Sequence, residues 1–283
     1  MEIKLVIENK RFDEERALYN LEDAAVVSCT FAGEADGESA LKECRRVTVK
    51  DCKFSLRYPL WHAQKYDIFD CEMDEGVRAP IWYSIRGNIR NSTIKGIKCL
   101  RECDQTNIVD CDIVSDEFGW RCRDVTLTGG SITSTYLLFE ASNVNMDNFS
   151  MKGKYSFQYT EDVSISDAYL DTKDAFWHAK NVRVENSTLK GEYLGWFSEN
   201  LTLINCRIIG TQPLCYCEGL KLVNCIMEET DLSFEYSEVE ADVVGHIVSV
   251  KNPKSGYIRA DSIGEIISDD SIMENNCRII CGK

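Results

Sequence analysis

The chain has 283 residues, with 47 Asp and Glu side chains against 32 Lys and Arg, and its formal net charge is −15. An acidic surface repels phosphate backbones, which argues against nucleic acid and polyanionic glycans as partners. No apolar segment approaches membrane-spanning length, and the short apolar run near the N-terminus is too brief for a signal-peptide core. We therefore expect a soluble cytoplasmic protein with no membrane or nucleic-acid partner.

A repeated block fills most of the chain after residues 1–20, which we expect to form an N-terminal cap. The block reads apolar-x-apolar-x-Asn/Asp-small-x-apolar and returns at intervals of 19 residues for most of its length. Its small residue, which we call the anchor, is Cys29, Cys52, Cys71, Ser92, Cys111, Gly130, Phe149, Ala168, Ser187, Cys206 or Cys225. Such regular repetition indicates one supersecondary unit stacked on itself.

The alternation of side chains around each anchor predicts a strand with one buried face. The positions three before and two after the anchor are apolar in every repeat, and the residues between them are largely polar. There is no room for a helix in each repeat, which argues against a leucine-rich repeat. We predict an all-β, single-stranded, right-handed parallel β-helix, a pectin-lyase-like solenoid with about 11 or 12 coils. Residues 1–283 would form a single domain, with repeat coils over 21–245 and C-terminal coils or a cap over 246–283.

The residue before the anchor is Asn or Asp in nine of the eleven repeats. Short amide and carboxylate side chains tolerate left-handed backbone and bond neighbouring backbone groups at a bend. Stacked asparagines also form hydrogen-bonded ladders, so we expect an asparagine ladder along the repeat. A cation site that includes Asp110 and Asp167 is the alternative interpretation.

The 14 cysteines follow the repeat and do not resemble a disulfide framework. Six are anchors, and four more occupy a second column in which other repeats have Ala, Ser or Thr: 44, 103, 122 and 217. A position that accepts these residues requires a small side chain, and free Cys is a small buried hydrophobe. Cys215 with Cys217, or Cys277 with Cys281, is an alternative metal-binding pair. We expect reduced thiols, no metal site and no cofactor.

A third column, mostly nine residues beyond the anchor, contains all five tryptophans of the chain. It reads Trp61, Trp82, Arg101, Trp120, Phe139, Gln158, Trp177, Trp196, Cys215, Phe234. The next position reads His62, Tyr83, Glu102, Arg121, Glu140, Tyr159, His178, Phe197, Tyr216, Glu235. Two interpretations stay open: the Trp rings stack inward as a hydrophobic spine, or they form a solvent-facing strip suited to sugars or proteins.

Glu102, Arg121 and Glu140 fall on successive coils and are weak catalytic candidates. Their two carboxylates would lie roughly 9 to 10 Å apart, near the upper limit for an inverting glycosidase pair. A cross-strand ion ladder, with Arg121 neutralising both neighbours, is the simpler interpretation.

Several strings resemble a known family. They include ERALYN at 15–20, YPLWH at 58–62, DAFWHAKNVRVENS from 174, GEYLGWFSENLTLINC from 191 and QPLCYCEGLKLVNC from 212. These strings are similar to the DUF3737 family, bacterial proteins of about this length. The resemblance implies a pectin-lyase-like right-handed β-helix, and it implies no activity and no catalytic residue.

These observations favour a non-catalytic recognition or interaction module for a neutral saccharide or a protein partner. The residues expected to bind the ligand are Trp61, Trp82, Tyr83, Trp120, Trp177, His178, Glu192, Tyr193 and Trp196. Whether the chain is an enzyme stays open. One alternative is a carbohydrate-active enzyme of the glycoside hydrolase or lyase type, with Glu102 and Glu140, or Glu192 and Glu235, as acid and base. The other is a homo-oligomeric scaffold.

Overall fold

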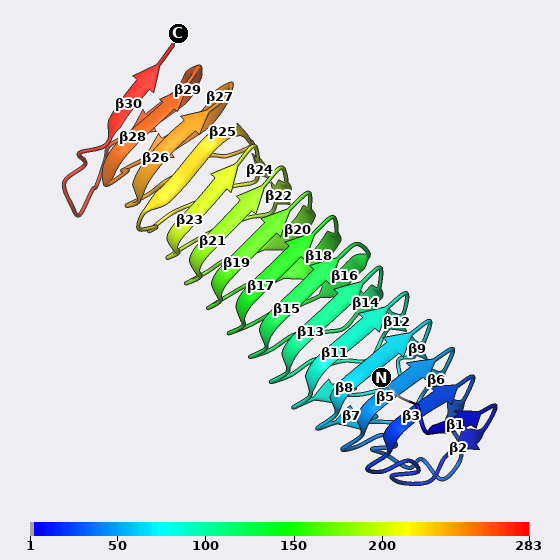
Figure 1. Ribbon diagram of the computed structural model, residues 1–283. Coiled ribbons are helices and arrows are strands. Elements are labelled where there is room, and N and C mark those ends of the chain that lie inside the picture. The colour runs from blue at the N-terminus through cyan, green and yellow to red at the C-terminus, as the bar shows by residue number, and fades with distance from the viewer. Residues whose placement is uncertain (1–2, 283) are drawn as a thin grey trace. The chain divides into compact units, whose positions relative to one another are not determined.

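The computed structural model describes residues 3–282 and contains strands, turns and bends throughout. No helix forms within that range, so no helix there is long and apolar enough to cross a membrane. Two compact units can be distinguished, Met1–Asn145 and Met146–Lys283. Both are built from short parallel strands, and Figure 1 shows these strands stacked coil on coil within each unit.

Unit 1 contains two long columns of strands, one strand of each column per coil. The first column is β1 (Leu5–Glu8), β3 (Glu22–Val27), β5 (Arg45–Lys50), β8 (Gln64–Phe69), β11 (Ile85–Arg90), β13 (Asp104–Val109) and β15 (Arg123–Thr128). The second is β2 (Arg11–Phe12), β4 (Thr30–Phe31), β6 (Lys53–Phe54), β9 (Glu72–Met73), β12 (Thr93–Ile94), β14 (Asp112–Val114) and β16 (Ser131–Ser134). A shorter pair, β7 (Leu60–Trp61) and β10 (Ile81–Trp82), begins a third face.

Unit 2 repeats this arrangement, and β17 (Ser142–Asp147) contains residues of both units. Its first column is β19 (Glu161–Ser166), β21 (Lys180–Glu185), β23 (Glu199–Ile204), β25 (Leu220–Glu228), β26 (Glu238–Val243), β28 (Ser255–Ala260) and β30 (Arg278–Cys281). Its second is β18 (Ser150–Lys154), β20 (Tyr169–Lys173), β22 (Thr188–Lys190) and β24 (Arg207–Ile209). The strands β27 (His246–Lys251) and β29 (Ser262–Ile267) form a separate parallel pair.

The predicted all-β parallel solenoid with a repeat of about 19 residues is confirmed. Ile89 lies in register between Ile68 and Ile108, and Val184 lies between Ile165 and Leu203; all six side chains are buried. The first column of strands gives about 15 coils rather than the predicted 11 or 12. The difference arises at the two ends, where residues that lack the repeat motif also form parallel strands such as β1 and β30.

The predicted left-handed bend before the anchor is confirmed. At Asp51, Asn91, Asp110 and Asn186 the φ angle is 52°, 48°, 51° and 49°. Asx residues tolerate this region better than most L-residues, which explains why the column is Asn or Asp. In unit 2, Asn224 donates to Asn205 (2.9 Å) and Asn205 donates to Asn186 (3.1 Å). An asparagine ladder along the whole repeat stays a prediction.

Twelve of the 14 cysteines are buried, and none of the cysteines in residues 3–282 forms a disulfide. The anchor thiols donate to the carbonyl two residues earlier, as Cys111 does to Val109 (3.3 Å) and Cys206 to Ile204 (3.3 Å). Burial raises the pKa of the Cys44 thiol to about 12 and that of Cys217 to about 11. The cysteines therefore act as small buried residues in the core, as the repeat indicates.

Thiol reactivity checks this assignment. In the native protein, Ellman's reagent should react rapidly only with Cys281, which is exposed, and more slowly with Cys277, which is half-buried. Burial also raises the pKa of the Cys277 thiol to about 11, which lowers its thiolate fraction. All 14 thiols should react in denaturant. Rapid reaction of the anchor cysteines in the folded protein would contradict the assignment.

One core contact depends on a glycine. Tyr66 is fully buried and lies in register with Gly87 of the next coil. A Cβ atom at position 87 would lie 2.2 Å from the Cζ atom of Tyr66. The glycine therefore provides the space that the tyrosine ring fills.

We predict that Gly87→Ala lowers the free energy of unfolding by about 1–3 kcal/mol, the usual cost of overpacking a core. In a Tyr66→Val background the same change should cost little, because valine occupies this column at Val47. Chemical denaturation of the two single variants and the double variant forms a double-mutant cycle. Additive effects would show that the two residues do not share this space.

Candidate functional site

The tryptophans of unit 1 form a stack that includes an arginine. The rings of Trp61 and Trp82 are parallel, with centroids 5.2 Å apart and an interplanar angle of 2°. The guanidinium carbon of Arg101 lies 4.8 Å from the ring centroid of Trp82 and 4.8 Å from that of Trp120. Arg101 also pairs with Glu117 (3.0 Å). The faces of these rings are therefore in contact with protein groups.

In unit 2, Trp177 and Trp196 stack with centroids 5.5 Å apart. All five indole N–H groups donate to a backbone carbonyl on the next coil: Trp61 to Ala79 (2.9 Å), Trp82 to Lys98 (2.7 Å), Trp120 to Tyr136 (3.3 Å), Trp177 to Tyr193 (2.7 Å) and Trp196 to Gln212 (2.7 Å). All five side chains are half-buried. The tryptophans thus lie between the two predicted arrangements, neither a buried spine nor an open strip, and their polar atom is used by the fold.

The exposed aromatic groups lie one position further along each coil. In unit 2 they form what we call the aromatic ladder, five rings from five coils: Tyr159, His178, Phe197, Tyr216 and Tyr236. Tyr159 is 52% exposed and Phe197 is 40% exposed. The first three steps have centroid distances of 4.9, 4.9 and 4.8 Å and interplanar angles of 12°, 7° and 14°. The last step, to Tyr236, is wider, at 5.8 Å and 41°.

This geometry determines which part of each ring is accessible. Parallel rings lying side by side in one plane could not bring their centroids within 5 Å, so neighbouring rings must overlap face to face. His178, Phe197 and Tyr216 each have a ring neighbour on both sides. The ladder therefore presents ring edges and the polar atoms of Tyr and His to solvent, and its inner ring faces are occupied.

The equivalent column in unit 1 is aromatic only at its start. His62 and Tyr83 stack at 5.1 Å, and both are exposed. The column then continues with the charged residues Glu102, Arg121 and Glu140. Arg121 Nε donates to Glu140 Oε2 (2.7 Å), and this hydrogen bond raises the pKa of the Arg121 side chain, with Glu102 adding a smaller electrostatic contribution. The arrangement is that of a surface ion ladder.

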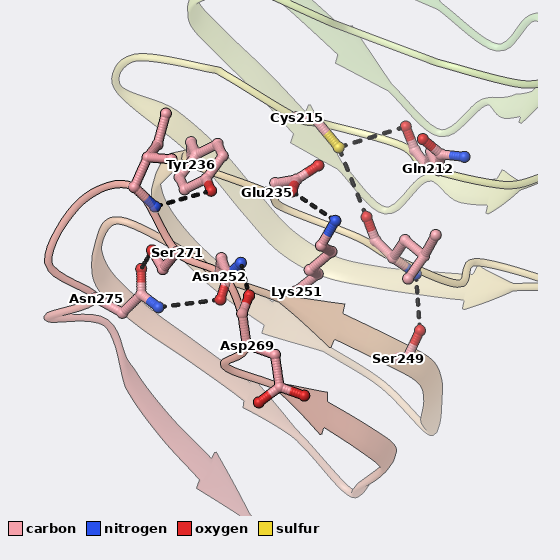
Figure 2. Close-up of polar contacts among 12 residues, drawn as sticks. Gln212, Cys215, Glu235, Tyr236, Ser249, Lys251, Asn252, Asp269, Ser271 and Asn275 are labelled. Atoms are coloured by element: carbon pink, nitrogen blue, oxygen red, sulfur yellow. Dashed lines mark hydrogen bonds and ion pairs between the residues drawn. The ribbon is translucent and has the colours of Figure 1, made fainter.

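The other predicted acidic residues are also paired with cations. Glu192 accepts from Lys173 Nζ (2.8 Å), and that ammonium group lies 4.9 Å from the centroid of the Tyr193 ring. Glu235 pairs with Lys251 (2.8 Å), which Figure 2 shows below Tyr236. Glu192 and Tyr193 therefore lie beside Trp196, whose ring is 5.3 Å from Tyr193, but Glu192 is bound to a lysine.

The last rung of the ladder contacts the segment between β29 and β30. The backbone N–H of Ile272 donates to the Tyr236 hydroxyl (3.3 Å). Asn252 Nδ2 donates to the Asp269 carbonyl (3.0 Å), and Asn275 Nδ2 donates to Asn252 Oδ1 (3.1 Å). Figure 2 shows these bonds joining the segment to the coil that carries Tyr236. The ladder thus ends against residues 268–277.

Of the predicted ligand-binding residues, the structure places only His178 in the ladder, and Tyr83 in the shorter unit 1 stack. Tyr159, Phe197, Tyr216 and Tyr236 were not predicted. Three of these four stand in the column after the tryptophans, so the repeat itself carried the signal. Tyr236 takes the place expected for Glu235, because one extra residue separates this coil from the preceding one.

No cluster of three or more His, Cys, Asp or Glu side chains suited to a metal ion occurs in residues 3–282. A shallow depression of about 360 Å³ lies beside β25 and β26 and is lined by residues that include Lys221, Glu238 and Ser255. It contains none of the ladder residues. The ladder is therefore an open surface and not a pocket.

A family model described as a protein of unknown function, DUF3737, matches residues 5–280. The chain belongs to the DUF3737 family. No curated protein matches this DUF3737 chain. Among solved structures it is similar to the surface adhesin PfbA of Streptococcus pneumoniae, with 10% identity, 82% of this chain and 75% of that chain covered, and a TM-score of 0.43.

Two further structures resemble the DUF3737 chain. ORF18 of Geobacillus virus E2 has 9% identity, with 85% of this chain and 52% of that chain covered and a TM-score of 0.38. The periplasmic alginate epimerase AlgG has 10% identity, with 98% and 76% covered and a TM-score of 0.23. At these identities the likeness concerns the fold alone.

The structural role of the tryptophans in this DUF3737 protein can be separated from the ladder by substitution. We predict that Trp196→Ala lowers the free energy of unfolding by about 2–4 kcal/mol, because it removes a half-buried stacked ring and the partner of the Gln212 carbonyl. Phe197→Ala, at the adjacent exposed position, should cost less than about 1 kcal/mol. Chemical denaturation measures both, and equal costs would contradict this division of roles.

Proposed function

We propose that this DUF3737 protein is a non-catalytic recognition module that binds a protein partner through the aromatic ladder of unit 2. The observation that carries the proposal is the row of exposed rings, Tyr159 to Tyr236, on consecutive coils. Soluble proteins seldom leave contiguous apolar surface open unless it takes part in binding. Aromatic side chains are also the residues most enriched where proteins bind proteins.

The orientation of the rings favours a protein over a neutral saccharide. Sugars bind aromatic residues by stacking on an open ring face, and the inner rings of the ladder have both faces occupied. A protein partner can pack apolar side chains against ring edges and accept or donate hydrogen bonds at the Tyr216 hydroxyl and the His178 ring nitrogens. A neutral saccharide is the outcome that the experiment below is designed to detect.

The acidic residues considered for catalysis are better explained as ion-pair partners. Glu140, Glu192 and Glu235 each contact a lysine or arginine at 2.7–2.8 Å. An acid and base pair needs one carboxyl group that holds a proton near neutral pH, and an adjacent cation favours the ionised form. We therefore propose no catalytic role for these residues.

We also propose an intracellular location, on the basis of thiol chemistry. Twelve buried thiols in a parallel β-core are compatible with folding in a reducing compartment, where cysteines do not pair during folding. The proposal can be checked by locating a tagged chain in fractionated cells.

A photo-crosslinking experiment tests the proposed surface. A benzophenone amino acid is placed at Phe197 in the ladder, or at Tyr169, a control position on β20 that is also exposed but lies outside the ladder. In cells, the position 197 variant should give a discrete protein adduct that the 169 variant does not. The adduct should be lost when Tyr159 and Tyr216 are both changed to Ser.

Saccharide binding is measured in parallel with the same purified protein. A panel of neutral oligosaccharides should produce no saturable change in intrinsic fluorescence. Saturable binding that is lost in Phe197→Ser, together with the absence of a protein adduct, would overturn the proposed partner class.

A further inference from the structure

The first coil leaves part of the apolar core open. Leu5 on β1 lies in register with Ala24 on β3, and Ala24 is fully buried. Leu5 therefore belongs to an inward-facing column, yet it is 48% exposed. In the second column Phe12 stacks on Phe31 at 5.3 Å and is only half-buried. This end thus presents core side chains that have a neighbouring coil on one side only.

The last coils show the same feature at the opposite end of the pairing order. Ile266 on β29 lies in register with the fully buried Val250 and is 50% exposed. Ile279 on β30 lies in register with the fully buried Ile258 and is half-buried. Figure 1 shows β30 as the final arrow beside β28.

Each end also has a strand edge that is not paired within the described residues. β1 pairs with β3 alone, and β30 pairs with β28 alone. An edge of this kind offers backbone donors and acceptors to another strand. Every strand pairing given above is parallel, so a strand added to either edge in the same sense would continue the existing pattern.

The charges on the two ends are complementary. The segment with β1 and β2 carries Lys4, Lys10 and Arg11 against the single acid Glu8. The segment from β29 to the start of β30 carries these charged residues: Asp261, Glu265, Asp269, Asp270, Glu274 and Arg278. Contact between two copies of one end would place like charges together, whereas contact between opposite ends joins a basic segment to an acidic one.

We propose that a second copy of this chain docks head to tail, with β1 of one copy against β30 of the other. The junction covers Leu5 and Phe12 of one copy with Ile266 and Ile279 of its neighbour, and it pairs the two open edges. The contact is heterologous, so each added copy leaves one free end of each kind and assembly continues into longer chains. This association does not involve the aromatic ladder and is independent of the proposed function.

The test uses two variants, each blocked at one end. Leu5→Glu puts an acid at the basic end, and Ile266→Lys puts a base at the acidic end. Both sites are half-exposed, so the far-UV circular dichroism and the unfolding midpoint should match the wild type. Val114→Glu, at a side chain that is 52% exposed on β14, is the matched control away from both ends.

Sedimentation velocity over a hundredfold concentration range gives the readout. The wild type and Val114→Glu should increase in mass with concentration, and each blocked variant should remain monomeric. An equimolar mixture of the two blocked variants should form a dimer and nothing larger, because it contains one intact junction. A monomeric wild type at all concentrations, or a blocked variant that dimerises by itself, would overturn the proposal.

Discussion

The parallel backbone hydrogen bonds between coils are the interaction on which the rest of the structure depends. They hold each residue over its counterpart one repeat away, as where Lys180 N–H donates to the Thr160 carbonyl (2.8 Å) and Glu199 N–H donates to the Ala179 carbonyl (2.9 Å). The register that stacks Val182 on Val163 in the core also stacks His178 on Tyr159 at the surface. Core and candidate site are therefore consequences of one spacing.

The ladder residues occupy a backbone conformation that most L-residues avoid. The φ angle is 56° at Tyr159, 54° at His178 and 59° at Phe197. A left-handed residue other than glycine costs about 1–3 kcal/mol, and the surrounding structure must compensate for this cost. The hydrogen bonds between coils and the ring contacts within the ladder supply that compensation. Bulky aromatic side chains at such a bend indicate that their exposure is a selected feature, consistent with binding.

The columns and the fold could be predicted from the sequence because alternation of apolar residues directly reports which side chains face inward. The anchor cysteines and the Asx bend followed from the same pattern. The direction of the aromatic columns could not be predicted in this way, because it depends on the turn between strands. Trp177 is half-buried and His178 is exposed, although both stand in aromatic columns. Coils without the motif, such as that of β1, were missed because their strands are recognised only by their pairing.

Deletion of a single coil would test the importance of the register most directly. Removing residues 168–186 takes out one repeat of 19 residues in unit 2 and joins Asp167 to Ser187, which restores the Asx–small step. We predict that this shortened chain retains the β-sheet circular dichroism spectrum and unfolds cooperatively. Removing residues 168–185 instead shifts every later column by one position and should abolish cooperative unfolding. If both deletions behave alike, whether both fold or both fail, the claim that the register governs this structure is contradicted.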